Sequence, residues 1–269
     1  MSETQKLTTH LLTLHQPLLK KATTHPFLRL AGTGTLPRPI LAQWLSQDRL
    51  YAQTYVRFIG LLLSKVELPL VPTPGGKKEK GEESIQERIV GVLIDALVNI
   101  QVELGFFERT AAEYGLELNT PTPGATSGTG QGEGKEGEVF GPNEVTRGYI
   151  NMFLSSGRPS TTLLEGLTVL WATEECYLRA WRYAQSFLSE SQSTGSQDAD
   201  GGALREKFIP NWASKEFEDF VKKIGDVLDE FAKLELGGDL SKKEALDKCE
   251  AWWGEVVRLE VGFWPDIQE

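Results

Sequence analysis

The chain has 269 residues, of which 40% are hydrophobic and seven are Trp, and this is enough apolar material for a sizeable core. The formal net charge of −10 argues against a nucleic-acid-binding protein, which needs a basic face, and against binding to an anionic membrane surface. The two cysteines form no CxxC pair, so the sequence offers neither a metal site nor a disulfide scaffold. Because the segment from Met1 to Lys6 is polar and lacks the features of a signal peptide, we expect a cytoplasmic protein.

Apolar residues recur at helical spacing along the chain, and no stretch shows the alternation of a strand. Ser84 with Glu87 three residues later predicts a capping box, and Gly115 predicts the end of the same helix. A loop is expected over residues 25–35, and Ser241 is expected to cap the last helix. Helices are predicted over residues 7–23, 38–64, 84–114, 143–155, 161–189, from 211–214 onward, and 241–263.

Three segments rich in Gly, Pro, Ser, Thr and charged residues cannot bury enough apolar surface to order themselves. They are predicted to be flexible inserts at about residues 69–83, 119–142 and 190–204. The most apolar window, Ile89–Phe107, contains polar residues and is predicted to be a buried helix and not a membrane span. The sequence therefore predicts an all-α, single-domain helical bundle over residues 1–269.

Three of the predicted helices carry an acidic residue in the middle of an aromatic face. The acids with their aromatic neighbours are Asp48 with Trp44, Tyr51 and Tyr55; Glu174 with Trp171, Tyr177 and Trp181; and Glu260 with Trp253, Phe263 and Trp264. A carboxylate on a core-facing stripe is unfavourable unless a hydrogen bond or an opposite charge compensates it. Because buried titratable clusters tend to mark sites, the three acids predict one polar pocket, with Tyr149 as a further candidate lining residue. An arginine such as Arg57 could instead neutralise a buried acid, and this structural alternative stays open.

Three stretches resemble motifs of the TenA/thiaminase-2 family. Residues 25–37 (HPFLRLAGTGTLP) are similar to the entry segment of that family, and residues 44–51 (WLSQDRLY) are similar to its QD-containing helix. Residues 260–264 (EVGFW) are similar to its C-terminal E..FW pattern. The resemblance extends from about residue 8 to residue 266, and it implies a helical bundle of the haem-oxygenase-like type and a homo-oligomer.

The resemblance also implies roles for individual residues. Asp48 matches the acid that holds the aminopyrimidine ring, Tyr51 matches an aromatic residue of the pocket, and Glu260 matches the glutamate proposed as catalytic acid and base. A carboxylate suits the first role because its two oxygens can accept hydrogen bonds from an exocyclic amine and a protonated ring nitrogen together.

The chain departs from the best-known branch of the family at the cysteine nucleophile. Ala172-Thr173 stands at the matching place, four to five residues before Tyr177, whereas Glu174 with Tyr177 and Trp181 resembles a glutamate-type branch. Cys176 follows Glu174 by two residues and is rotated by roughly 200° around the helix axis, so it is expected to point away from the pocket.

The sequence thus predicts a hydrolase of thiamin-derived aminopyrimidines in thiamin salvage, acting on aminomethylpyrimidine or its N-formyl form. No cofactor, metal, nucleic acid or membrane is expected to take part. Glu260 and Glu174 are the predicted catalytic residues, acting as acid and base at a water molecule and an amine leaving group. The predicted substrate-binding residues are Asp48, Tyr51, Tyr177, Trp44, Trp181 and Tyr149.

Three alternatives stay open. A haem-type ligand would require an axial residue, for which His10, His15 and His25 are the only histidines. A PQQ-synthesis-like oxidase on the same scaffold would need a more basic pocket than these acidic stripes provide. A non-catalytic pyrimidine-binding or regulatory protein would keep the bundle and bind the ring without turnover.

Overall fold

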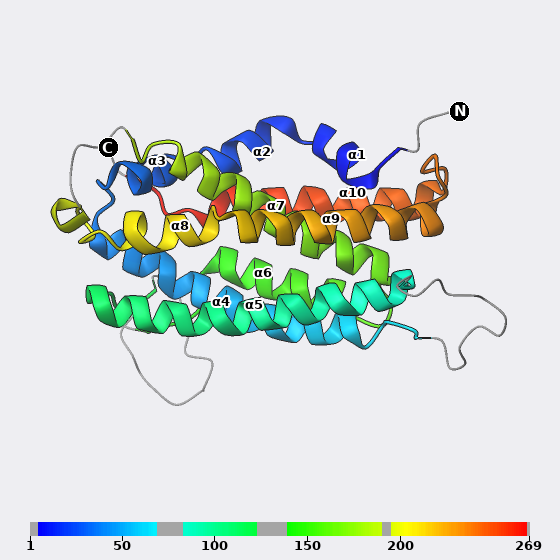
Figure 1. The fold of residues 1–269 in the computed structure, drawn as a ribbon, viewed down its shortest axis with the longest axis horizontal. Helices are drawn as coiled ribbons and strands as arrows, with labels where there is room; N and C mark the ends of the chain where they lie inside the picture. Colours follow the sequence, from blue (N-terminus) through cyan, green and yellow to red (C-terminus); the bar gives the residue numbers. More distant parts are fainter. Residues whose placement is uncertain (1–4, 69–82, 123–138, 190–194, 268–269) are drawn as a thin grey trace.

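The computed structural model describes residues 5–68, 83–122, 139–189 and 195–267, and these residues contain no strand. Figure 1 shows an elongated bundle in which the long helices run along one axis. The helices are α1 (Leu7–Thr13), α2 (Gln16–Thr23), α3 (Pro26–Thr33), α4 (Arg38–Leu63), α5 (Ile85–Tyr114), α6 (Glu144–Ser156), α7 (Leu163–Gln185), α8 (Ile209–Trp212), α9 (Lys215–Leu236) and α10 (Lys243–Phe263). The predicted all-α fold is confirmed.

The long helices form two layers. One layer contains α4, α5 and α6, and the other contains α7, α9 and α10, with the short helices α1, α2 and α3 covering the second layer (Figure 1). Helix α4 packs on α5 and α6, and α7 packs on α9 and α10. The layers meet where α5 contacts α9 and where α4 and α6 contact α7.

Local signals in the sequence set most helix ends. Ser84 and Glu87 form the predicted capping box of α5, and Gly115 ends that helix in the left-handed conformation. Helix α7 begins with a second capping box, made by Thr162 and Glu165. These caps fix the start of two of the helices that supply acidic residues to the interior.

The N-terminal region differs from the prediction in two places. Residues 7–23 form two helices, broken by His15 at a φ of 52°, because Pro17 lacks the N–H that a continuous helix needs. Residues 26–33, expected to be a loop, form α3. His25 caps this helix, Pro26 lies in its first turn, and Gly34 ends it at a φ of 73°, so the prolines and glycines mark the two ends of a short helix.

Two further expectations need correction. The cap of α10 is Lys242 and not Ser241, and it makes no side-chain hydrogen bond. Residues 195–204, expected within a flexible insert, include the 3₁₀ turn Gly195–Gln197 and lead into the π-helix Leu204–Phe208. Buried Asp200 orders this segment by accepting hydrogen bonds from the backbone N–H groups of Gly202 (2.9 Å) and Leu204 (2.8 Å).

The other predicted inserts fall largely on residues 69–82, 123–138 and 190–194, which lie outside the described residues. The two described ends of the middle segment lie side by side, because the Thr122 N–H donates to the Val139 carbonyl at 3.0 Å. The Gln47 side chain holds both ends by donating to the Thr122 hydroxyl (2.9 Å) and to the Gly141 carbonyl (3.1 Å). The described ends of this segment are therefore anchored next to Asp48 on α4.

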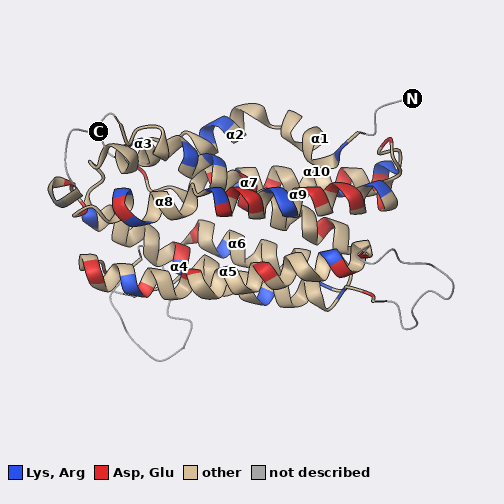
Figure 2. Ribbon diagram, viewed as in Figure 1, with Lys and Arg blue, Asp and Glu red and all other residues tan. Residues whose placement is uncertain are grey.

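Helix α5 is an outer helix and not the buried helix that its hydropathy suggested. Among the described helices it alone has the length and apolar composition of a membrane span, and only 22% of its most apolar window is buried. One face packs on α4 and α9, while Ile94, Val98 and Val102 are exposed. Figure 2 shows few charged residues along α5, whereas acidic and basic residues alternate along α9. The expected homo-oligomer stays a prediction.

Candidate active site

A cavity of about 250 Å³ opens between the two layers of the bundle. Among the described residues, its wall includes four acidic residues, Asp48, Glu103, Glu174 and Glu216, and no Lys, Arg or His. Its aromatic lining residues are Tyr51, Tyr55, Phe107, Tyr177, Trp212, Phe217 and Phe220. In the described part of the chain, no three His, Cys, Asp or Glu side chains are arranged to hold a metal ion. The volume and the flat aromatic walls suit one small ring-shaped ligand.

Asp48 reaches the cavity from α4. It is 3% exposed, and its Oδ2 accepts a hydrogen bond from the Tyr177 hydroxyl at 3.2 Å. Burial raises the pKa of Asp48 well above its ordinary value, and the neighbouring carboxyl of Glu103 adds to this effect. Arg57 is exposed, so it does not supply the opposite charge that the structural alternative required. A ligand that brings positive charge would stabilise the ionised form of Asp48.

Glu174 reaches the same cavity from α7. Its Oε1 accepts a hydrogen bond from the Tyr55 hydroxyl at 2.6 Å. Burial raises the pKa of Glu174 to about 7, and the Tyr55 hydrogen bond opposes that increase. A carboxyl with a pKa near neutrality can both take up and release a proton at physiological pH.

Glu260 lies one layer behind the cavity wall. The Tyr149 hydroxyl donates to its Oε1 at 2.6 Å, while its buried Oε2 has no hydrogen-bond partner among the described residues. Burial raises the pKa of Glu260 to about 7, with Glu174 adding to the increase. The Tyr149 ring meets the ring of Tyr51 edge-on, with their centroids 5.1 Å apart. Tyr51 lines the cavity, so Tyr149 and Tyr51 connect Glu260 to it.

Trp44 and Trp181, predicted to stack on a ligand, do not line the cavity. Both are buried, with their ring centroids 5.4 Å apart. Trp181 also packs against Trp212, which does line the cavity, at a centroid distance of 4.4 Å. The two indoles therefore support the wall from behind. The sequence could not show this, because helical spacing fixes the face of a helix but not the depth that a side chain reaches.

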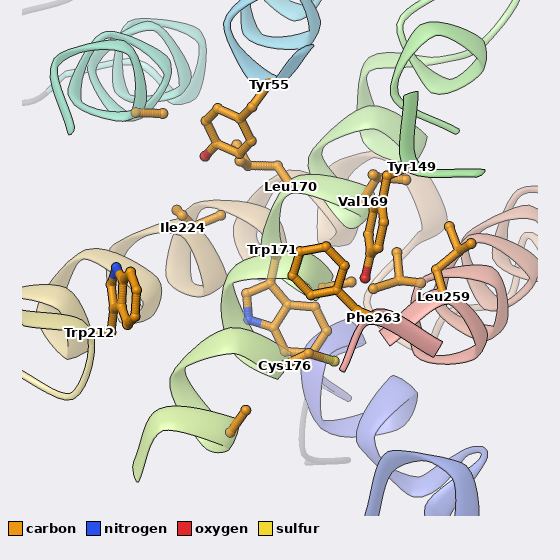
Figure 3. Packing of buried hydrophobic residues seen from close by; sticks show 14 of the residues in the cluster. Tyr55, Tyr149, Val169, Leu170, Trp171, Cys176, Trp212, Ile224, Leu259 and Phe263 are labelled. Atoms are coloured by element: carbon orange, nitrogen blue, oxygen red, sulfur yellow. The ribbon is translucent and has the colours of Figure 1, made fainter. Parts of the chain in front are cut away.

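Cys176 is fully buried and is not among the cavity residues. In Figure 3 it is separated from Tyr55 and Trp212, two residues that line the cavity. Burial raises the pKa of the Cys176 thiol well above its ordinary value, and this disfavours the nucleophilic thiolate.

The three histidines also lie outside the cavity lining. His10 Nε2 lies 2.6 Å from Glu250 Oε1, and His25 Nδ1 accepts the Phe27 N–H at 3.2 Å. His15 occupies the turn between α1 and α2. No histidine is therefore placed to coordinate a haem in this cavity, and the acidic wall does not suit a tricarboxylate ligand.

Two acids of the cavity, Glu216 on α9 and Glu103 on α5, were not predicted as site residues. For Glu103 the signal was present, since Ala96, Ile100, Glu103 and Phe107 follow the same helical spacing as the other acidic stripes, and all four line the cavity. Burial raises the pKa of Glu103 to about 7. The structure thus brings Asp48, Tyr51, Glu174 and Tyr177 to one cavity, adds the acids Glu103 and Glu216, and places Trp44, Tyr149, Trp181 and Glu260 behind its wall.

Comparison with known proteins links the chain to TenA proteins. The model of the TENA/THI-4/PQQC family matches residues 13–71, a stretch that contains Asp48 and Tyr51. A protein of Fusarium pseudograminearum described as a "Probable transcription factor" is 30% identical over 293 residues, covering 97% of this chain and 53% of that protein. The chain therefore spans about half the length of that relative. A Glycine max protein described as a "Probable bifunctional TENA-E protein" is 20% identical over 250 residues, covering 93% of this chain and 88% of the relative.

Solved structures show the same fold. A TenA homologue from Pyrococcus furiosus superposes with a TM-score of 0.69 at 22% identity, over 96% of this chain and 98% of that one. A TenA homologue from P. horikoshii superposes with a TM-score of 0.67 at 19% identity, over 97% of each chain. These likenesses establish a TenA-like helical fold.

Proposed function

We propose that this chain hydrolyses thiamin-derived aminopyrimidines, with aminomethylpyrimidine or its N-formyl form as substrate. The observation that carries the proposal is the cavity of Asp48, Glu174 and aromatic rings, whose wall contains no basic side chain in the part of the chain that the structure describes. Such a wall favours a flat, cationic ring over an anionic ligand. The TENA/THI-4/PQQC match over residues 13–71 and the TenA-like fold support the same substrate class.

Asp48 is the residue proposed to hold the ring. Its two oxygens would accept hydrogen bonds from the exocyclic amine and from the protonated ring nitrogen of the aminopyrimidine. The resulting ion pair would compensate the unfavourable burial of the carboxylate, which raises its pKa in the absence of a ligand. Tyr51 and Tyr177 would then border the two faces of the ring.

Glu174 is proposed as the base. It takes a proton from water while the water oxygen bonds to the methylene carbon of aminomethylpyrimidine. The carbon–nitrogen bond breaks, Glu260 supplies a proton to the departing nitrogen, and the products are hydroxymethylpyrimidine and ammonia, or ammonium where the amino substituent is bound in its protonated form. For the N-formyl form, the same pair would direct water to the formyl carbon and release formate. Each well-placed proton transfer contributes on the order of 10²–10⁴ in rate.

Attack by water is favoured over a covalent thioether intermediate. Thr173 stands where the cysteine-type branch of the family has its nucleophile, and its hydroxyl hydrogen-bonds the carbonyls of Val169 (3.2 Å) and Leu170 (3.0 Å). Cys176 is buried away from the cavity. We therefore expect little cleavage of intact thiamin.

A second candidate is a protein that binds the pyrimidine without turnover. The position of Glu260 favours it, because this carboxyl does not line the cavity and reaches it only through Tyr149 and Tyr51. In the first proposal, the side chains of this wall must rearrange when the ring binds, so that the free Oε2 of Glu260 meets the departing amine.

Incubation of the purified chain with aminomethylpyrimidine, its N-formyl form and thiamin, followed by chromatography with mass detection, distinguishes the candidates. The hydrolase predicts hydroxymethylpyrimidine or the free aminopyrimidine at a rate at least tenfold above that from thiamin. Tight binding without product over hours would support the second candidate. Absence of both binding and product would overturn the two together.

A further inference from the structure

Glu103 is an acid of the cavity that the proposed mechanism does not use. Its two oxygens each accept one hydrogen bond from α8: Oε2 from the Asn211 amide at 3.2 Å, and Oε1 from the Trp212 indole N–H. Both donors are neutral, so the carboxylate is fixed in place while its charge stays uncompensated. Each oxygen also keeps a lone pair that a ligand donor could use.

Glu103 and Asp48 share this cavity and repel each other. Among its neighbouring charges, Glu103 has the largest influence on Asp48, ahead of Glu260 and Glu174. Because the cavity wall holds no Lys, Arg or His among the described residues, the repulsion is relieved either by protonation of one of the two carboxyls or by positive charge that a ligand brings. A neutral substituent adds no positive charge to that of the ring, and a phosphate group adds a further repulsion.

We propose that Glu103 is a specificity-determining residue of this cavity, whose carboxylate selects aminopyrimidines with a cationic substituent over those with a neutral or a phosphorylated substituent. The inference rests on the proposed function in taking an aminopyrimidine as the ligand. Asp48 on α4 holds the ring, and Glu103 on α5 selects ligands by the charge of their substituent. We call this selection the charge filter. The selected class is an aminopyrimidine with a protonated amino substituent, and the excluded class is its phosphate ester.

A purely structural role for Glu103 is the competing explanation, since the residue also anchors Asn211 and Trp212 of α8. Glu103→Gln separates the two roles. Glutamine keeps the volume and an oxygen that accepts the Trp212 N–H, but it removes the negative charge. A loss of anchoring would weaken every ligand alike, whereas a loss of charge would change affinity according to the charge of the ligand.

The test is calorimetric titration of the full chain with three probes that share the ring and differ in the charge of its substituent: aminomethylpyrimidine, hydroxymethylpyrimidine and hydroxymethylpyrimidine phosphate. Glu103→Gln should weaken binding of the first about tenfold and leave that of the second within about twofold, since a charge-assisted contact is roughly twice as strong as a neutral one. Binding of the phosphate should strengthen. The matched control is Glu108→Gln, the same change at an exposed position of α5 outside the cavity lining.

The outcomes separate this inference from the proposed function. If the wild-type chain binds aminomethylpyrimidine and Glu103→Gln shifts all three affinities equally, or matches Glu108→Gln, the charge filter is wrong and the proposed function stands. If the wild-type chain binds none of the three probes, the proposed function fails and the charge filter fails with it. A melting curve of each variant checks that α8 stays folded on the bundle.

Discussion

Replacing Glu174 with glutamine is the sharpest test of the proposed chemistry. The Tyr55 hydroxyl, 2.6 Å from Glu174 Oε1, can donate to the glutamine oxygen in the same way, so the wall of the cavity should keep its shape. The change removes only the capacity to accept a proton. We therefore expect kcat for aminomethylpyrimidine to fall by about 10²–10⁴, with KM changing by no more than about threefold.

The pH profile gives a second readout of the same variant. Burial raises the pKa of Glu174 to about 7, and a base must be deprotonated to act, so wild-type activity should rise as the pH increases through about 7. The apparent pKa belongs to the acidic cluster, since Glu103 and Glu260 titrate in the same range. Glu174→Gln should abolish this rising limb.

Release of ammonia, measured in a coupled assay between pH 5.5 and 8.5, gives both quantities. Glu175→Gln is the matched control, because Glu175 is the next residue on α7 and pairs at the surface with Arg179 at 2.6 Å. Activity of Glu174→Gln within threefold of Glu175→Gln, with an unchanged rising limb, would refute the assignment of Glu174 as the base.

Further predictions follow from single contacts. Asp48→Asn should weaken binding of hydroxymethylpyrimidine by about 10- to 100-fold in calorimetry, since it removes the charged partner of the ring; an unchanged Kd would place the ring elsewhere. Burial raises the pKa of Glu260 from 4.5 to about 7, so this carboxyl holds a proton more tightly in the folded chain than in the unfolded chain. The free energy of unfolding should therefore fall by up to about 3 kcal/mol as the pH rises from about 4.5 to 7. Glu260→Gln should therefore be more stable than wild type at pH 8 but not at pH 4.5 in urea unfolding, and a parallel loss in both proteins would contradict this. Cys176→Ala should keep activity within about threefold, because this thiol lies outside the cavity lining. A loss on the order of 10² or more would instead indicate a cysteine-dependent mechanism. Gly32→Ala should destabilise the chain by about 1–3 kcal/mol in the same unfolding assay, since the added Cβ would lie 2.1 Å from the carbonyl oxygen of Ala184; wild-type stability would show that α3 does not pack there.

The sequence was informative where a pattern depends on local geometry. The capping box of Ser84 and the glycine end at Gly115 lie where they were predicted, because such motifs depend only on residues a few positions apart. The loop expected at residues 25–35 was wrong for a related reason. Pro26 and Gly34 mark the start and the end of helix α3. Because these two helix-breaking residues lie so close together, the whole stretch was interpreted as a loop.

The sequence predicted which residues of the candidate site lie on inward helix faces, but not how far each side chain reaches toward the cavity. Helical spacing placed Asp48, Glu174 and Glu260 on inward faces, and all three are largely buried, with a pKa raised above its ordinary value. Spacing could not show that Glu260 stops behind Tyr149, since this depends on how α6 and α10 pack. Glu103 was missed because its neighbours at helical spacing include Ala96 and Ile100, which are not aromatic, so its stripe looked like ordinary core.

A crystal structure of the chain with hydroxymethylpyrimidine, the proposed product, tests the central claim most directly. We predict that the ring lies in the cavity between α4, α5, α7 and α9, with its exocyclic amine and one ring nitrogen within hydrogen-bonding distance of the Asp48 oxygens. A ring bound outside this cavity, or one bound inside it without contact to Asp48, would contradict the assignment of this cavity as an aminopyrimidine site.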